Sequence, residues 1–310
     1  MLGYDDVCCF SSSTNTRNRK VLWEITNQCN LKCGFCHRNI YNDRLEPSYD
    51  EVLKILDILK SSNITKIIIS GGEPFCRSDI IDILINIKKK GFEVDMCTNA
   101  TLITLKDIVK LSKVLSEISV SVDSANDEQH DNIRGIKGSW MKSINTIKRM
   151  IELGLEVHII SILDEKNIAY LNETVAFFYD LHVHSVSFIG KIPIGQNSNR
   201  LLMEDIQYEL MEVFKNIRKY YTDFRINTKQ VFSNENNICT SGQNVFGISA
   251  DNILYPCILQ RHIKGLNILS ENIDTIYNAF NTRYKWVETW SVGNHGCCVG
   301  SKSINTRLTR

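Results

Sequence analysis

Residues 20–36, KVLWEITNQCNLKCGFC, place a run of apolar and β-branched residues directly before three closely spaced cysteines. The run predicts a buried strand. Five similar runs follow, separated by segments with apolar residues at helical spacing. Strands that alternate with helices predict a parallel sheet of six βα units. The strands are expected at residues 20–25, 66–70, 92–98, 117–123, 156–163 and 184–190.

Amphipathic segments lie between the expected strands. Residues 49–62, 78–91 and 139–154 show the helical pattern most clearly, and the last two end in Gly. A further helix is expected at about 203–221. In a parallel βα array, functional residues gather beyond the carboxyl ends of the strands, and the motifs of the core described below lie there.

The composition excludes several classes of protein. The 310 residues carry 36 Lys and Arg against 35 Asp and Glu, unlike the basic chain of a dedicated nucleic-acid binder. No stretch reaches the roughly 20 apolar residues needed to span a bilayer, and the first residues lack the positive charge of a secretory signal. We therefore expect a cytoplasmic protein without a membrane or nucleic-acid partner, in which the 11 cysteines stay reduced.

The pattern changes near residue 225, where Asn becomes frequent. Residues 244–257, NVFGISADNILYPC, predict a short hairpin that turns at Asp251-Asn252, and a helix is expected near 272–282. We therefore predict three parts, namely a flexible arm at 1–19, a core at 20–225 and a small C-terminal domain at 226–310.

Cys29, Cys33 and Cys36 lie within eight residues on the loop after the first expected strand. Three thiolates on one loop can converge on a single metal centre. A structural zinc site closes with four ligands, whereas a cubane cluster bound by three cysteines leaves one iron open to another ligand. The pattern favours a [4Fe–4S] cluster with an open iron. A zinc loop with a distant fourth ligand, and with His37 adjacent, is the alternative.

The CxxxCxxC motif, with the aromatic Phe35 before its third cysteine, resembles the signature of the radical S-adenosylmethionine (SAM) superfamily. The similarity extends over residues 20 to about 200. It implies an α/β fold, a partial (β/α)6 TIM-type barrel in which the amino and carboxylate groups of SAM bind the open iron. It also implies that an electron, from a flavodoxin or ferredoxin type donor, cleaves SAM to methionine and a 5'-deoxyadenosyl radical. That radical would take a hydrogen atom from a substrate carbon.

The segment Ser70-Gly71-Gly72-Glu73-Pro74 ends the second expected strand. Two glycines let backbone approach a ligand closely, although the same residues could form no more than a tight turn. The segment resembles the GGEP motif of the superfamily. The resemblance implies that Gly71, Gly72 and Glu73 receive the methionine amino group of SAM.

Polar residues at later strand ends resemble positions that contact SAM in the superfamily. Asn99, Ser121 and Asp123 are similar to residues that meet methionine or ribose, although Asn and Asp also cap helices. Arg134, at an expected helix start, resembles the basic residue aimed at the methionine carboxylate, although it could equally be a surface charge. The expected cofactor-binding residues are Phe35, Gly71, Gly72, Glu73, Asn99, Ser121, Asp123 and Arg134.

Four cysteines of the C-terminal part, Cys239, Cys257, Cys297 and Cys298, could fill one cubane cluster. Residues 238–257 and 265–280 resemble the SPASM and shortened twitch extensions of radical SAM enzymes. This implies one auxiliary [4Fe–4S] cluster at most. Relatives usually place the last pair as CxxC, so the adjacent cysteines here leave His295 or the substrate as a possible fourth ligand. Buried cysteines without metal are the alternative.

Cys8, Cys9, Cys76 and Cys97 follow no ligand pattern and are interpreted as packing residues or exposed thiols. Cys97 lies at a strand end that faces the expected pocket. A thiol there could return a hydrogen atom to a substrate radical, as happens in epimerising relatives.

Three functions are compatible with these motifs. The first hypothesis is the modification of a ribosomally made peptide by a thioether or carbon crosslink, oxidation or epimerisation. The 19 residues before the first strand are too few for the peptide-binding domain of many maturases, although some lack it. The second is a dehydrogenase or epimerase of a sugar, cyclitol or aminoglycoside. The third, a non-catalytic metal-binding module, would neither bind nor cleave SAM.

Overall fold

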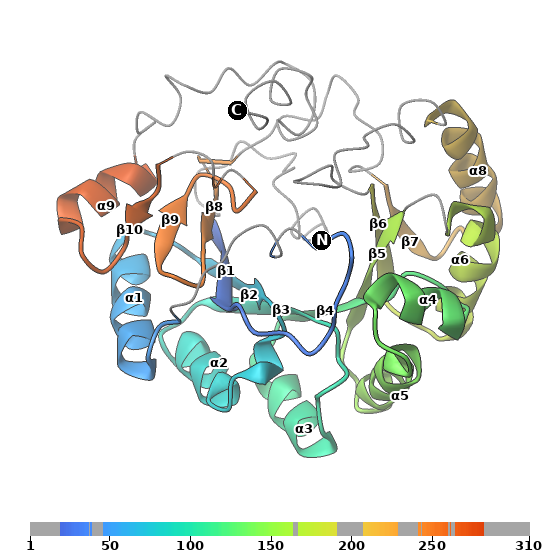
Figure 1. Ribbon diagram of the computed structural model, residues 1–310, viewed down its shortest axis with the longest axis horizontal. Coiled ribbons are helices and arrows are strands. Elements are labelled where there is room, and N and C mark those ends of the chain that lie inside the picture. Colours follow the sequence, from blue (N-terminus) through green and yellow to red (C-terminus); the bar gives the residue numbers. More distant parts are fainter. Residues whose placement is uncertain are drawn as a thin grey trace.

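The strands of the computed structural model form one curved sheet with helices along its outer side (Figure 1). The sheet is open, because β7 and β10 are the two ends of its strand order and do not pair within the described part of the chain. The predicted partial barrel is therefore confirmed. The structure describes residues 19–36, 38, 46–163, 167–190, 207–228, 241–242, 244–259, 261 and 264–281.

Six parallel strands in chain order make the core of the sheet, and each expected strand is confirmed to within two residues at either end. A seventh strand, β7 (Arg225–Asn227), pairs in parallel with β6 and was not predicted, because three residues are too few for a periodic signal. The six core strands are β1 (Lys20–Thr26), β2 (Lys66–Gly71), β3 (Glu93–Thr98), β4 (Glu117–Ser121), β5 (Val157–Leu163) and β6 (Ser185–Gly190).

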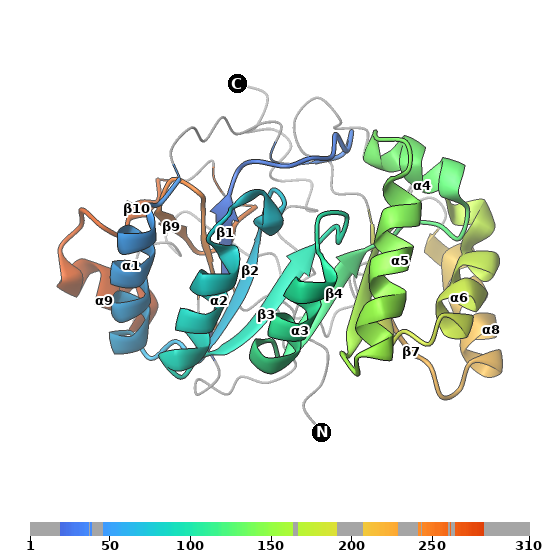
Figure 2. The ribbon, with the colours of Figure 1, turned by 90° about the horizontal axis from the view of Figure 1, so that it is seen from below.

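Helices follow the strands as crossover connections and line the outside of the sheet (Figure 2). Ser48 and Thr104 start two of them with capping boxes, in which each side chain accepts a bond from the backbone three residues on. None of the described helices is both long and apolar enough to cross a membrane. The helices are α1 (Tyr49–Ser61), α2 (Ile80–Lys89), α3 (Leu105–Val114), α4 (Asp127–Arg134), α5 (Ser139–Glu152), α6 (Leu171–Asp180), α8 (Gln207–Tyr220) and α9 (Ile273–Asn281), with short 3-10 turns η2 (Pro74–Cys76) and η3 (Ile168–Tyr170).

The two faces of the sheet differ in chemistry. Along β1, Val21, Trp23 and Ile25 alternate toward the helices and are completely buried in the apolar core. The opposite face carries charge, since Lys66 Nζ lies 2.6 Å from Asp95 Oδ2 inside the arc. The core that holds the strands in place is therefore the outer layer, while the inner face also carries buried charged side chains.

The C-terminal segment extends the same sheet beyond β1. The strand β8 (Val245–Ile248) pairs in parallel with β1. The strand β9 (Ile253–Tyr255) then pairs antiparallel with β8, which confirms the predicted hairpin. Asn252 adopts a φ of 66° in the turn. The strand β10 (Leu266–Asn267) pairs with β9, and α9 confirms the last expected helix. The division into an arm, a core and a C-terminal domain stays a prediction.

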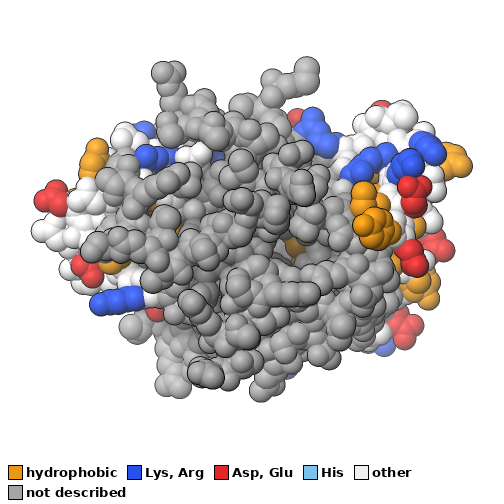
Figure 3. Space-filling view, turned by 90° about the horizontal axis from the view of Figure 1, so that it is seen from above, with side chains coloured by type: hydrophobic (Ala, Val, Ile, Leu, Met, Phe, Trp, Pro, Cys, Tyr) orange, Lys and Arg blue, Asp and Glu red, His pale blue; other side chains and the backbone are white. Residues whose placement is uncertain are grey.

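One face of the molecule, seen from above, carries charged side chains of both signs beside apolar ones at its right rim (Figure 3). This is the side on which α6 and α8 lie in Figure 1. Exposed apolar side chains of α8 include Tyr208, Met211 and Tyr220. The described side chains of this rim therefore mix charge with apolar surface.

Candidate functional site

The cluster loop, residues 27–36, leaves β1 and passes over the carboxyl ends of the neighbouring strands toward α4 (Figure 2). It lies against the glycine pair that ends β2, where Gly72 N donates to Thr26 O at 2.8 Å. A Cβ on Gly72 would lie 1.9 Å from Gln28 O, and one on Gly71, at φ +116°, would lie 2.4 Å from Thr26 O. Glycine is therefore required at both positions for this close backbone approach.

Two further contacts fasten the cluster loop to other parts of the core. Asn30 Nδ2 donates to Thr101 Oγ1 at 2.7 Å, and Asn99 Nδ2 donates to Asn30 Oδ1 at 2.9 Å. Lys32 N donates to Arg134 O, at the end of α4, at 3.0 Å. The loop is thus fixed at β2, β3 and α4.

The three cysteines of the loop line one cavity of about 250 Å³. Cys97 and six of the eight predicted cofactor-binding residues also line it; these six are Phe35, Gly71, Gly72, Asn99, Ser121 and Arg134. Their positions confirm that the strand ends meet at one site, while the contact of each with SAM stays a prediction. The lining residues outside the expected cofactor-binding set are Leu31, Arg38, Ser70, Thr98, Ile160, Ile162, Ile189, Gly190 and Leu259.

The apolar part of this wall follows from strand alternation. Ile160 and Ile162 are two residues apart on β5, so both point to the same face of the sheet, and Ile189 lies beside them on β6. Their spacing was visible in the sequence, but which face of the strand lines the cavity was not. Arg38 follows the last cysteine of the loop by two residues, which was the available signal for it.

The donor set of the loop fits an iron-sulfur cluster. Among the described residues, no three His, Cys, Asp or Glu side chains converge on a single metal ion. Cys29, Cys33 and Cys36 instead share one cavity wall, as a cluster requires when each thiolate binds a separate iron. Burial raises the pKa of Cys29 and of Cys33, so binding the iron would release protons from these thiols. His37 lies outside the described residues.

Glu73 does not line the cavity and is completely buried behind it. Its carboxylate accepts bonds from Thr98 Oγ1 at 2.7 Å, from Asn99 N at 2.7 Å and from Phe75 N at 3.1 Å. Burial raises the pKa of this carboxyl group, and the three bonds oppose the shift. Glu73 therefore joins the ends of β2 and β3 and orients Asn99, while its predicted contact with the SAM amino group stays a prediction.

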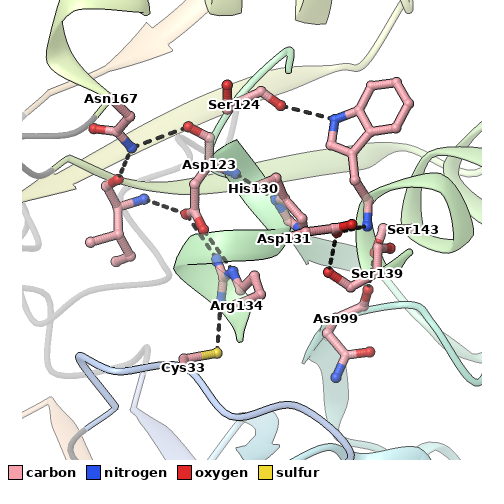
Figure 4. Close-up of polar contacts among 12 residues, drawn as sticks. Cys33, Asn99, Asp123, Ser124, His130, Asp131, Arg134, Ser139, Ser143 and Asn167 are labelled. Atoms are coloured by element: carbon pink, nitrogen blue, oxygen red, sulfur yellow. Dashed lines mark hydrogen bonds and ion pairs between the residues drawn. The ribbon is translucent and has the colours of Figure 1, made fainter. Parts of the chain in front are cut away.

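Arg134 is the last residue of α4, so its expected place at a helix start was wrong. The residues before it are almost all polar, which gave no helical signal. It is also no surface charge, because 6% of the residue is exposed. Its Nε lies 2.6 Å from Asp123 Oδ2, and its Nη1 lies 3.9 Å from Cys33 Sγ (Figure 4). Asp123 itself does not line the cavity.

Cys97 reaches the cavity from the end of β3. Loss of solvent raises the pKa of its thiol to about 12, with further contributions from the charges of Asp95 and Glu117. The thiol is therefore protonated at neutral pH. Cys76, in η2, lies outside the cavity lining.

Cys257 follows β9 and is buried. The segment that it starts, residues 257–261, is held at two points. A Cβ on Gly247 would lie 2.6 Å from Ile258 N, and Arg261 forms a buried ion pair with Glu24 of β1. Leu259, between these points, lines the cavity. The other predicted ligands of the auxiliary cluster, Cys239, Cys297, Cys298 and His295, lie outside the described residues, as do Cys8 and Cys9.

Comparisons with known proteins agree with this site. The antilisterial bacteriocin subtilosin biosynthesis protein AlbA of Bacillus subtilis is 31% identical over 170 residues, which are 54% of this chain and 38% of that protein. An AdoMet-dependent heme synthase of Methanosarcina barkeri is 28% identical over 195 residues, which are 62% of this chain and 56% of that protein. This chain thus spans about half the length of these curated relatives, or less.

The fold is shared with a solved structure, that of Streptococcus suis SuiB bound to precursor peptide SuiA. The TM-score is 0.77 at 18% identity, over 92% of this chain and 72% of that one. The predicted kinship with radical SAM enzymes is confirmed. A model described as the radical SAM superfamily matches residues 23–178, which contain the cluster loop and the ends of β1 to β5. This match covers half of the chain, and the chain therefore belongs to the radical SAM superfamily, whose cofactors are a [4Fe–4S] cluster and SAM.

Proposed function

We propose that this protein reductively cleaves SAM and uses the resulting radical to modify a ribosomally made peptide. The observation that carries the proposal is the shared cavity, which is lined by the three cysteines together with Asn99, Ser121 and three isoleucines. The names of AlbA, a bacteriocin biosynthesis protein, and of SuiB, solved with a precursor peptide, support a peptide substrate.

Each wall of the cavity has a distinct task in this proposal. Cys29, Cys33 and Cys36 bind three irons of the cluster, which, when bound, supplies the electron that breaks the carbon–sulfur bond of SAM. The backbone of Gly71 and Gly72, which lines the same cavity, receives the methionine part of SAM.

The apolar part of the lining shields the reactive species. Ile160, Ile162 and Ile189 present hydrocarbon surface to the cavity, which disfavours water beside the radical. Asn99 and Ser121 orient the polar parts of SAM. A flavodoxin or ferredoxin type protein is the proposed electron donor.

Cys257 is a proposed ligand of the auxiliary cluster, together with Cys239, Cys297 and Cys298. Leu259 lines the cavity two residues after Cys257, which brings this segment beside the proposed substrate position. An auxiliary cluster there would be close enough to bind or oxidise the substrate.

Cys97 is the proposed source of the hydrogen atom that returns to a substrate radical. Its raised pKa keeps the thiol protonated, which this role requires. The variant Cys97→Ala should release 5'-deoxyadenosine at a rate similar to that of the unchanged protein and yield no product deuterated from D₂O. Loss of both would instead assign Cys97 a structural role.

The test of the proposed function incubates the anaerobically reconstituted protein with SAM, dithionite and the short peptides encoded by the reading frames that flank its gene. We expect 5'-deoxyadenosine release together with a peptide mass change of about −2 Da for crosslinking or oxidation, or about +1 Da in D₂O for epimerisation. Cys36→Ala is the matched control and should show neither. Deoxyadenosine release stimulated by a sugar, cyclitol or aminoglycoside, and by no peptide, would overturn the peptide assignment.

A further inference from the structure

A buried ion pair lies directly behind the cluster loop (Figure 4). Arg134 and Asp123 are joined by two contacts, Nε to Oδ2 at 2.6 Å and Nη2 to Oδ1 at 2.8 Å. Asp123 is 1% exposed. Opposite charges interact more strongly, and are screened less by salt, when they are buried in this way. The pair is therefore a fixed feature of the electrostatic field at the loop.

The guanidinium of Arg134 is held close to a cluster ligand. Its Nη1 donates to Cys33 Sγ at 3.9 Å, and its central carbon lies 5.3 Å from the ring centre of Phe35. The backbone holds it as well, because Arg134 O accepts the bond from Lys32 N. Gly135, at φ +74°, permits this approach, since a Cβ there would lie 2.5 Å from Lys32 O.

The carboxylate of Asp123 is held from the other side. Ile162 N donates to Asp123 Oδ1 at 2.9 Å, and Asp123 N donates to His130 Nδ1 at 3.3 Å. Asn167 Nδ2 donates to Asp123 O at 3.1 Å. Asp123 is thus held by three elements, namely β5, α4 and the turn that contains Asn167. Arg134 lies between this carboxylate and the thiol of Cys33 (Figure 4).

We infer that Arg134 and Asp123 are positioning residues that set the reduction potential of the cluster bound by Cys33, and that they act with opposite sign. Reduction adds one negative charge to the cluster. A cation at the thiolate stabilises the reduced state, whereas the carboxylate behind it offsets part of that effect. The inference rests on the cluster of the family and not on the identity of the substrate.

The test is a redox titration of the reconstituted protein in the absence of peptide. Electron paramagnetic resonance monitors the reduced cluster at each potential. The signal that changes when SAM is added identifies the cluster of Cys33, but the potential is measured in the absence of SAM. Arg134→Gln should shift the potential to more negative values. Asp123→Asn should shift it to more positive values, and the double variant should lie closer to the unchanged protein than either single variant does.

Controls separate charge from damage to the fold. Lys137→Gln removes an exposed cation three residues from Arg134 and should leave the potential unchanged, because solvent screens that charge. Arg134→Lys keeps the charge and should lie closer to the unchanged protein than Arg134→Gln does.

Shifts of the same sign in Arg134→Gln and Asp123→Asn would overturn the inference. If Asp123→Asn fails to bind iron, the other variants still decide, because equal potentials for Arg134→Gln and Arg134→Lys would overturn it too. Failure of the peptide assay would leave this measurement untouched, since no substrate takes part in it.

Discussion

Two cysteine-bearing segments border the same cavity, but they are held there in different ways. The cluster loop, residues 27–36, is fixed mainly through the backbone, by close approach to the glycines of β2 and by the bond from Lys32 N. Residues 257–261 are fixed by the ion pair between Arg261 and Glu24 and by close packing on Gly247.

The difference shows which contacts leave a trace in a sequence. A backbone approach requires glycine, and two adjacent glycines after a strand form a motif that can be recognised. An ion pair between two distant residues forms no local pattern. The predictions that follow test whether the two segments depend on these different contacts, in order of decreasing effect.

The largest effect is expected for Gly72→Ala. The added Cβ would overlap Gln28 O, so the cluster loop must move away from β2. Displacement of about 1 Å at a reacting centre costs roughly 100-fold in rate. We expect iron binding at the loop to fall and 5'-deoxyadenosine release to drop by at least that factor.

Gly34→Ala is the matched control, because it changes the same loop where nothing lies within 4 Å of the new Cβ. Iron content and SAM cleavage should stay near those of the unchanged protein. Equal losses in both variants would show that the loop does not depend on its contact with β2.

Arg261→Met should destabilise the protein by about 3 kcal/mol, because it withdraws the guanidinium from a buried carboxylate. Denaturant unfolding measures this loss. The double variant Glu24→Gln/Arg261→Met removes both charges and should recover a large part of the stability. An unchanged stability of Arg261→Met would mean that the ion pair does not hold residues 257–261.

The buried side chain of His158, on β5, predicts a dependence of stability on pH. His158 Nδ1 lies 2.6 Å from Ser185 Oγ and its Nε2 lies 3.0 Å from Ser187 Oγ. Burial, together with smaller contributions from the charges of His184 and Arg225, lowers its pKa to about 3. The unfolded chain, with a His pKa of about 6.5, therefore binds a proton at a pH where the folded protein does not.

Stability should consequently fall as the pH is lowered from about 6.5 to 4, by roughly 3 kcal/mol from this residue. His158→Gln lacks the titrating group, so its stability relative to the unchanged protein should rise over the same range. His182→Asn, on an exposed turn with φ 60°, is the control and should keep the original slope. If the free energy of unfolding changed with pH in the same way for His158→Gln and the unchanged protein, the imidazole of His158 would not be buried in its neutral form.

The smallest effect is expected at the helix starts. Ser48 Oγ accepts the bond from Glu51 N at 3.3 Å, and its loss in Ser48→Ala should cost about 1 kcal/mol. Thr104→Ala removes the equivalent bond from α3 and should cost a similar amount. Thermal unfolding measures both. Neither variant should change the iron content, and a loss of iron in either would link the outer helices to the cluster loop.

The parts of the fold that were predicted are those with a strong local pattern. Six strands follow from continuous apolar runs, and the hairpin at Asp251-Asn252 follows from its turn residues. The helix α4 was missed because its eight residues include only one apolar side chain, Ile133. Its stability depends on tertiary contacts of Arg134 and Asp131, which no local pattern reveals.

The site was predictable where chemistry is written in consecutive residues, as in the cysteine motif and the glycine pair. It was not predictable where a residue acts from behind the cavity wall. Glu73 and Asp123 were both expected at the ligand, yet neither lines the cavity. Their burial depends on partners from neighbouring strands, such as Thr98 and Ile162.

The central claim, that the loop of three cysteines binds a cluster which cleaves SAM, is tested most directly by one comparison. Iron is counted, and 5'-deoxyadenosine release from SAM after dithionite is followed, in the reconstituted protein and in the Cys29/Cys33/Cys36→Ala variant. We predict about eight irons per chain in the first and about four in the second, with no SAM cleavage by the variant. Zinc in place of iron, or equal deoxyadenosine release by both proteins, would contradict the account.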